Sequence, residues 1–229
     1  MKRTGTTTCM LGVALVAGLG LAPQTLATPI LGMTVSTDMS TATGYDIANV
    51  INGSGLAGGP ALSGQHASAS TDNAWLSTAT SGNIIIDLGG DYDLSGFTFW
   101  NTNWDHGTPN SKGKYGINDV TFLYSLGGSA FTAIPGAPLS LSKQNSTTDI
   151  TPDIFTFTSI TADTVKIMIT GNHGADGVGM AEIQFDGSRL ESSAIAQESA
   201  SVPEPTTLAM LCLGLTGLGV ARQRTARQA

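Results

Sequence analysis

The sequence predicts an all-β domain built as an antiparallel β-sandwich. Three observations predict this fold class: apolar residues recur at every second position in several segments between residues 84 and 186, turn-forming clusters separate these segments, and none of them has a helical period. Successive side chains of a strand point to opposite faces of a sheet, so the alternation gives each segment one buried face. Two sheets packed through such faces enclose one core.

The predicted strands follow one another along the chain as far as residue 186. Their apolar faces consist of Ile84, Ile86 and Leu88; Phe97 and Phe99; Val120, Phe122 and Tyr124; Phe155 and Phe157; Val165, Ile167 and Ile169; and Ile183 and Phe185. Turns are predicted at residues 89–91, 127–129 and 135–136, because glycine supplies positive φ and proline presets φ at the start of a turn. Each turn is expected to separate strands of the sandwich.

Residues 1–27 are typical of a secretory signal peptide. Two basic residues precede an apolar segment at residues 10–22, and small residues stand at the two positions that a signal peptidase reads before the cut. We expect cleavage after Ala27, with Ala22 as the alternative site. The mature chain is therefore expected to be exported.

Residues 202–229 have the order of a sorting tail, in which a short signal, an apolar run at residues 208–220 and three arginines follow one another. The signal consists of Val202, Pro203, Glu204 and Pro205. This order resembles the PEP-CTERM sorting tail of exported bacterial proteins. The resemblance implies processing by an exosortase-type enzyme and secretion or surface display in a Gram-negative bacterium.

The apolar run also predicts how the tail behaves before processing. It is shorter than the roughly 20 residues that a stable transmembrane helix needs, so a transient anchor in the inner membrane is expected. The arginines that follow it resist translocation and remain cytoplasmic. The alternative is a C-terminal amphipathic helix packed on the core, but the run is apolar on every side.

Removing both ends changes the composition of the chain. Both cysteines, Cys9 and Cys212, lie in the targeting segments, so no disulfide is expected in the mature protein. Residues 28–201 carry five basic and 16 acidic side chains, a formal net charge of −11. Such a chain is not expected to bind nucleic acid or an anionic membrane surface. We expect one domain at residues 28–187 and a polar, flexible linker at residues 188–201.

Several sequence motifs occur in a characteristic order along the domain. They are the segments at residues 49–53, 72–76, 83–89, 120–125 and 181–185. Together they resemble a discoidin domain, the coagulation factor V/VIII type C module, over residues 33–186. The resemblance implies a jelly-roll sandwich of the galactose-binding-like superfamily that binds carbohydrate without catalysis. The chain departs from the family at Asn52, where Asp is usual, and in an enlarged Gly-rich loop at residues 54–73.

The same resemblance implies a structural calcium ion between the loop after the first strand and the last strand. Its implied ligands are the Glu182 carboxylate, the Ala181 carbonyl and oxygens of Asn49, Asn52, Ser54 and Asp72. Calcium accepts carboxylate, amide and carbonyl oxygens in flexible geometry, so this set is chemically suitable. The alternatives are that Asn52 and Gly53 merely form a turn and that Glu182 faces solvent.

Two predicted loops combine aromatic rings with planar hydrogen-bonding groups, which is the chemistry that holds a sugar. The candidate ligand-binding residues are Asn101, Asn103, Trp104, Asp105, His106, Tyr115 and His173. In the alternative reading, both histidines are plain surface residues. Trp100, by contrast, is expected to close the core at the end of a strand.

No motif predicts catalysis. The Gly-rich spacing at residues 53–58 matches a dinucleotide fingerprint, but Gly59 and Pro60 follow where a helix should begin. The sequence has neither a metalloprotease helix motif nor a nucleophile elbow. The leading hypothesis is therefore an exported protein that binds carbohydrate or extracellular polysaccharide. A structural or adhesive surface protein is the alternative, and an extracellular glycan hydrolase is a third hypothesis.

Overall fold

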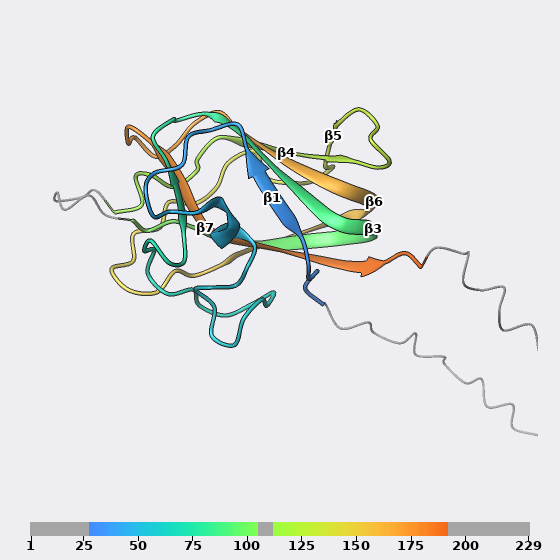
Figure 1. The fold of residues 1–229 in the computed structure, drawn as a ribbon, viewed down its shortest axis with the longest axis horizontal. Coiled ribbons are helices and arrows are strands. Elements are labelled where there is room, and N and C mark those ends of the chain that lie inside the picture. Colours follow the sequence, from blue (N-terminus) through green and yellow to red (C-terminus); the bar gives the residue numbers. More distant parts are fainter. Residues whose placement is uncertain (1–27, 105–111, 192–229) are drawn as a thin grey trace, which may run out of the picture.

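The computed structural model describes residues 28–104 and 112–191, which contain seven strands and one short 3-10 helix (Figure 1). The elements are β1 (Thr34–Thr37), η1 (Ile47–Val50), β2 (Trp75–Ser77), β3 (Gly82–Asn101), β4 (Val120–Ser125), β5 (Thr132–Ala133), β6 (Asp153–Ile169) and β7 (Val178–Arg189). All paired strands are antiparallel. In this part of the chain no helix is long and apolar enough to cross a membrane.

The sheet folds over itself because two long strands take part in both layers. Residues 82–87 of β3 lie between β1 and β6, and β4 and β5 continue this layer beyond β6. Residues 92–101 of β3 lie between β6 and β7, and β2 closes this second layer beyond β7. The prediction of an antiparallel β-sandwich is confirmed.

The expected turn at residues 89–91 is wrong, because β3 continues through it as one bent strand. Gly89 and Gly90 adopt φ of 78° and 155°, and the register with β6 shifts between Asp87 and Tyr92. Positive φ lets the strand change direction without leaving its partner. The two strands expected around Phe155 and Val165 are likewise one strand, β6.

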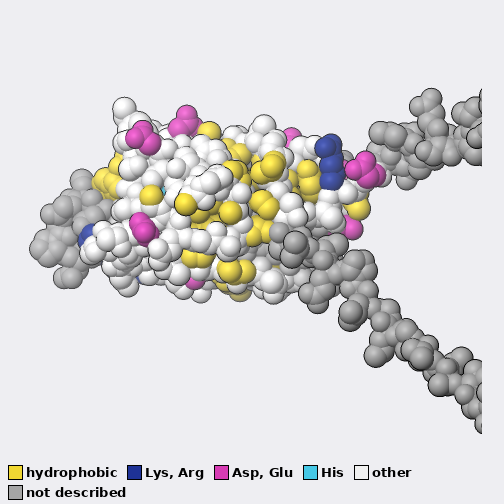
Figure 2. All heavy atoms as spheres, turned by 90° about the horizontal axis from the view of Figure 1, so that it is seen from below, with side chains coloured by type: hydrophobic (Ala, Val, Ile, Leu, Met, Phe, Trp, Pro, Cys, Tyr) yellow, Lys and Arg dark blue, Asp and Glu magenta, His cyan; other side chains and the backbone are white. Residues whose placement is uncertain are grey.

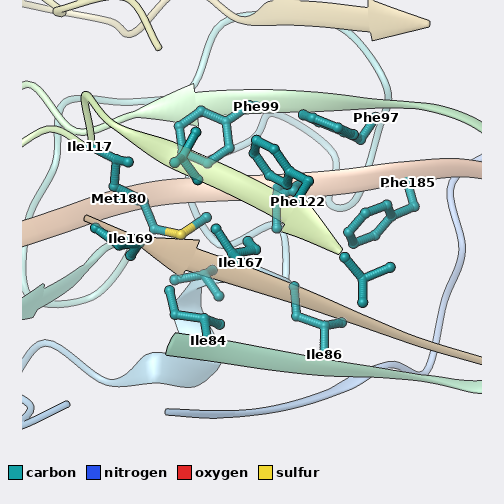
Figure 3. Packing of buried hydrophobic residues seen from close by; sticks show 14 of the residues in the cluster. Ile84, Ile86, Phe97, Phe99, Ile117, Phe122, Ile167, Ile169, Met180 and Phe185 are labelled. Carbon is teal, nitrogen blue, oxygen red and sulfur yellow. The ribbon is translucent and has the colours of Figure 1, made fainter. Parts of the chain in front are cut away.

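The core lies between the two layers (Figure 3). Ile84, Ile86, Ile167 and Ile169 face Phe97, Phe99, Met180 and Phe185 across it. Nearly all apolar positions predicted to face inward are buried, and only Tyr124, Phe155 and Phe157 are partly exposed. The alternation in the sequence therefore predicted the core side of each strand correctly.

The Gly-rich loop at residues 54–73 packs on the outer face of the second layer. Leu56 joins a small cluster with Trp100, Ile150 and Ala181, which lie on the side of the sheet away from the main core. The Trp100 indole N–H donates to the Gly64 carbonyl at 3.0 Å. Trp100 is buried at the end of β3, as expected, but it closes this small outer cluster and not the main core, and its partners come from this loop.

The loop also holds a buried histidine. His66 is fully buried, its main-chain N–H donates to the Ile150 carbonyl at 3.0 Å, and Ile150 returns the bond at 2.7 Å. A Cβ at Gly55 would lie 2.0 Å from the His66 ring, so only glycine fits beneath it. The enlarged loop is therefore a packed part of the domain, and it covers this outer face.

The surface carries few positive charges. Figure 2 shows apolar side chains gathered in the middle of the face seen from below, with Asp and Glu side chains scattered over it. An open groove of about 610 Å³ runs beside the Gly-rich loop between residues 60–63 and the outer side of Ile154.

Candidate functional site

Three aromatic rings from distant segments meet next to the end of β3. The Trp104 ring is edge-to-face against Tyr115, with a centroid distance of 4.8 Å and an interplanar angle of 88°. Tyr45 packs against Trp104 in the same way at 6.0 Å and 87°. Tyr115 is buried, whereas Trp104 and Tyr45 are half-buried. We call Tyr45, Trp104 and Tyr115 the ring cluster.

A carboxylate is attached to the ring cluster. The Tyr115 hydroxyl donates to Oδ1 of Asp176 at 2.6 Å, and Asp176 itself is exposed. Burial, together with the neighbouring carboxylate, raises the pKa of Tyr115 to about 12. The phenol is therefore neutral at physiological pH, and its hydroxyl donates a hydrogen bond to Asp176.

The main chain holds these groups rigidly in place. The Tyr115 carbonyl accepts the Gly179 N–H at 2.7 Å, and this bond ties the loop before β4 to β7. A Cβ at Gly177 would lie 2.2 Å from the Ser77 carbonyl oxygen and 3.2 Å from the Tyr115 ring. The Asn172 amide then shapes the loop that carries Asp176 by donating to the Ala175 and Gly177 carbonyls.

Two of the predicted ligand-binding residues lie in the interior. Asn101 donates to the carbonyls of Ile117 at 2.7 Å and Ser142 at 3.0 Å, and it is fully buried. Asn103 is 3% exposed and donates to the carbonyls of Ser146 and Thr148. These amides are occupied in holding loops together, so they are not part of the surface that a ligand meets.

The other predicted residues are placed as follows. Trp104 and Tyr115 come together in the ring cluster, whereas Asp105 and His106 lie outside the described residues. The main-chain N–H of His173 donates to the Gly116 carbonyl. Its ring is partly buried, Nε2 has no hydrogen-bond partner within the described part, and burial lowers its pKa. Burial therefore disfavours the charged form of the His173 ring.

Tyr45 is the member of the ring cluster that the sequence analysis missed. It stands in a polar segment before η1 and belongs to no alternating pattern. An isolated aromatic residue among Gly, Thr and Asp was the one available signal. Its contact with Trp104 depends on the path of the chain, which no local pattern predicts.

Glu182 forms a second polar centre on β7. Its side chain is fully buried, Oε2 accepts the Gly53 N–H at 3.0 Å, and Oε1 accepts a bond from the Gln184 amide. Burial raises the pKa of Glu182 to about 8, against the smaller opposing effect of the two hydrogen bonds. The alternative of a solvent-facing Glu182 is wrong.

The other implied metal ligands differ in burial and in their hydrogen-bond partners. Asn49 is buried and donates to the carbonyls of Thr71 and Ala74, while its Oδ1 accepts from Asn52. Oδ1 of Asn52 accepts the Ser54 N–H. Ala181 is buried beside Glu182 in β7, and Asp72 is exposed.

The chemistry of these groups fits a calcium-type ion better than a transition metal. Every side-chain donor in this set is oxygen, the ligand type that calcium prefers. The described residues contain no group of three or more His, Cys, Asp and Glu that could hold a metal ion. Oε1 of Gln184 is buried without a hydrogen-bond partner in the described part of the chain. That amide oxygen has unused acceptor capacity, whereas both oxygens of the Glu182 carboxylate accept hydrogen bonds.

Comparison with known proteins identifies the tail. Residues 201–224 match the PEP-CTERM protein-sorting motif, which confirms the prediction made for the C-terminus and indicates an exported protein sorted to the cell envelope. This motif covers a small part of the chain. No curated protein matches the sequence.

Similar solved structures include carbohydrate-binding modules of family 32. CBM32-2 of a GH31 protein, solved bound to GalNAc, is 15% identical, with a TM-score of 0.49 over 69% of this chain and 98% of that one. The family 32 CBM of Clostridium perfringens NanJ, solved with galactose, is 15% identical, with a TM-score of 0.45 over 67% and 92%.

A third similar structure is a much longer protein. The family 89 glycoside hydrolase of Clostridium perfringens is 21% identical, with a TM-score of 0.46 over 70% of this chain. This chain spans 14% of the length of that enzyme. At these TM-scores the likeness carries no argument about ligand or activity.

Proposed function

We propose that this chain is an exported, non-catalytic protein that binds carbohydrate, such as extracellular polysaccharide, at the ring cluster. The observation that carries the proposal is the half-buried Trp104 ring held between Tyr45 and Tyr115 beside the Asp176 carboxylate. A fixed, partly exposed aromatic group next to a planar acceptor is the combination that sugar recognition uses.

Each group has a separate task in this proposal. The exposed part of Trp104 or Tyr45 packs against the C–H face of a pyranose, which removes apolar surface of both partners from water. Asp176 accepts hydrogen bonds from sugar hydroxyls, and its bond to Tyr115 keeps the carboxylate oriented. Hydrogen bonds to a charged acceptor are stronger than neutral ones, so Asp176 favours hydroxyl-rich ligands.

We propose that the ring cluster binds sugar without hydrolysing it, because of the number of carboxylates that contact the cluster. Glycoside hydrolysis generally uses two carboxyl groups on opposite sides of the bond that is cleaved. Within the described residues, Asp176 is the one carboxylate hydrogen-bonded to the cluster. The buried Glu182 is engaged with Gly53 and Gln184 and does not face solvent.

The calcium ion is a further part of the proposal. Glu182, Asn49, Asn52 and the Ala181 carbonyl would hold it, with Ser54 and Asp72 as additional oxygen donors from the adjacent loop. When bound, the ion supplies a positive charge that stabilises the ionised Glu182 carboxylate and links β7 to the loop after η1. Its role is structural, and sugar binding at the ring cluster does not require it to touch the ligand.

Processing and location complete the proposal. The sorting motif supports recognition of residues 202–205 by an exosortase-type enzyme in a Gram-negative envelope. The apolar run that follows would anchor the chain in the inner membrane until the tail is processed. The domain would then face a polysaccharide-rich exterior.

The test is retention on immobilised polysaccharides and a glycan array, using residues 28–229 in mild detergent. We expect Trp104→Ala to abolish retention and Phe131→Ala to preserve it, because Phe131 packs under Lys166 and outside the ring cluster. Equal unfolding midpoints of the two variants would show that both are folded. Absence of retention on every glycan would instead favour the structural or adhesive surface protein.

A further inference from the structure

The first described residues extend the sheet along β7. Pro29 forms an isolated antiparallel bridge with Asp186, and the Ile30 N–H donates to the Phe185 carbonyl at 3.2 Å. The Ile30 side chain is buried in the main core. The segment that begins at Thr28 is therefore part of the fold.

The main-chain nitrogen of Thr28 lies against a carboxylate. It is 3.3 Å from Oδ1 of Asp186, and Oδ2 of the same carboxylate accepts the Ser95 hydroxyl at 3.0 Å. The Ser95 bond orients Asp186 toward the N-terminal segment. Because Pro29 has no N–H, the Thr28 nitrogen is the donor that precedes Ile30 at this edge.

The charges around this contact favour a cation. Thr28 and Asp186 line an open groove of about 760 Å³, together with Tyr92 and Asp93 of β3 and Arg189 of β7. The residue that β6 contributes to the lining of this groove, Ser159, is uncharged. Two carboxylates and one guanidinium group therefore line the groove, and the Arg189 side chain donates to the Gly89 carbonyl.

We propose that cleavage between Ala27 and Thr28 creates an α-ammonium group that forms an ion pair with Asp186 and fastens the N-terminal segment to β7. The oxygen of a water molecule bonds to the Ala27 carbonyl carbon, the bond from that carbon to the Thr28 nitrogen breaks, and both protons of the water go to the nitrogen, which leaves a carboxylate on Ala27 and an ammonium group on Thr28. Cleavage after Ala22 would leave five residues before Thr28 and no charge at this nitrogen. Maturation thus strengthens the mature fold.

The proposal predicts a particular pH dependence. An α-amino group has a pKa of about 8 in the unfolded chain, and the carboxylate raises it in the folded protein. The added stability is therefore fully present below about pH 8 and is lost as pH rises through the folded pKa. Exposed ion pairs of this kind change the folding equilibrium by roughly twofold to fivefold.

The test compares two chains that begin at different residues, each with and without one substitution. Residues 28–229 and 26–229 are each prepared with Asp186 and with Asp186→Asn, and unfolding by urea is measured in the same detergent. We expect Asp186→Asn to shift the unfolding equilibrium about twofold to fivefold more in the chain that starts at Thr28. This excess should disappear near pH 10.5, whereas Asp163→Asn, at the Gly127 turn, should act equally on both chains.

Two results would overturn the inference. N-terminal sequencing of the exported protein is expected to begin at Thr28, and any other first residue contradicts the assigned cleavage site. If Asp186→Asn destabilises both chains equally at neutral pH, the Asp186 carboxylate contributes only its hydrogen bonds with the Thr28 nitrogen and the Ser95 hydroxyl, and no ion pair. Neither result depends on sugar binding, so this inference and the proposed function fail separately.

Discussion

The side-chain amide of Asn103 ties two separate stretches of chain, residues 68–69 and 146–148, to its own segment after β3. Its Nδ2 donates to the Thr148 carbonyl at 2.8 Å and to Ser146, and its Oδ1 accepts the Ala69 N–H at 2.9 Å. A buried amide supplies hydrogen-bond partners to main-chain groups that water does not reach. Trp104 is the next residue, so this anchor also fixes where the ring cluster begins.

We expect Asn103→Ala to lower the free energy of unfolding by about 2–4 kcal/mol, because it leaves buried carbonyl and N–H groups without partners. Asn118→Ala is the matched control. Among the described residues its side chain donates only to the neighbouring Asp119 at the surface, so its effect should stay within about 0.5 kcal/mol. Urea unfolding of both variants measures the difference. Equal losses would mean that Asn103 is not the anchor.

The buried carboxyl group of Glu182 is expected to make the stability of the domain depend on pH. Because burial raises its folded pKa to about 8 from an ordinary value of 4.5, the folded state retains a proton that the unfolded chain releases. In chelator, stability should therefore fall as pH rises from about 4.5 to about 8 and then level off. Glu182→Gln should flatten this slope, as measured by unfolding at a series of pH values.

Added calcium tests whether the Glu182 carboxylate binds a metal ion or only takes up a proton. If the ion binds, it should restore the stability of the native sequence above about pH 8 and leave Glu182→Gln unchanged, since the amide offers no charge. Unfolding with and without millimolar calcium measures this. A calcium effect of equal size in both proteins would place the ion elsewhere.

At the scale of elements, the bend of β3 decides how the sandwich is built. Gly89 and Gly90 carry the strand from the layer of β1 and β4 into the layer of β7 while β6 remains its neighbour. One pair of strands thereby supplies both halves of the core. A register shift on the β6 side accompanies the change of layer.

Substitution of Gly89 tests the bend. Its φ of 78° is costly for residues with a Cβ, least for Asn and most for β-branched residues. We expect Gly89→Asn to lower the free energy of unfolding by about 1 kcal/mol or less and Gly89→Val by roughly 2 kcal/mol or more. Thermal unfolding measures the order, and equal losses for both would show that φ is not the cause.

For the whole molecule, local patterns predicted the fold better than the site. Alternation identified the buried faces, since burial of a strand depends on its own neighbours. It did not show that Gly89 and Gly90 bend a strand instead of ending it, because both outcomes need positive φ. Nor did it bring Tyr45 to Trp104 or bury Asn101, which depend on contacts between distant segments.

The tail acts on the molecule as a whole by setting where the domain resides. If residues 202–205 are the processing signal, replacing all four by Ala should leave the apolar run attached and hold the protein in the inner membrane. The intact mass of the envelope-associated protein then includes residues 206–229, whereas that of the native protein lacks them. Purified domains of both proteins should retain polysaccharide equally, because the replacement leaves Tyr45, Trp104 and Tyr115 of the ring cluster unchanged. Identical masses would show that the four residues do not direct processing.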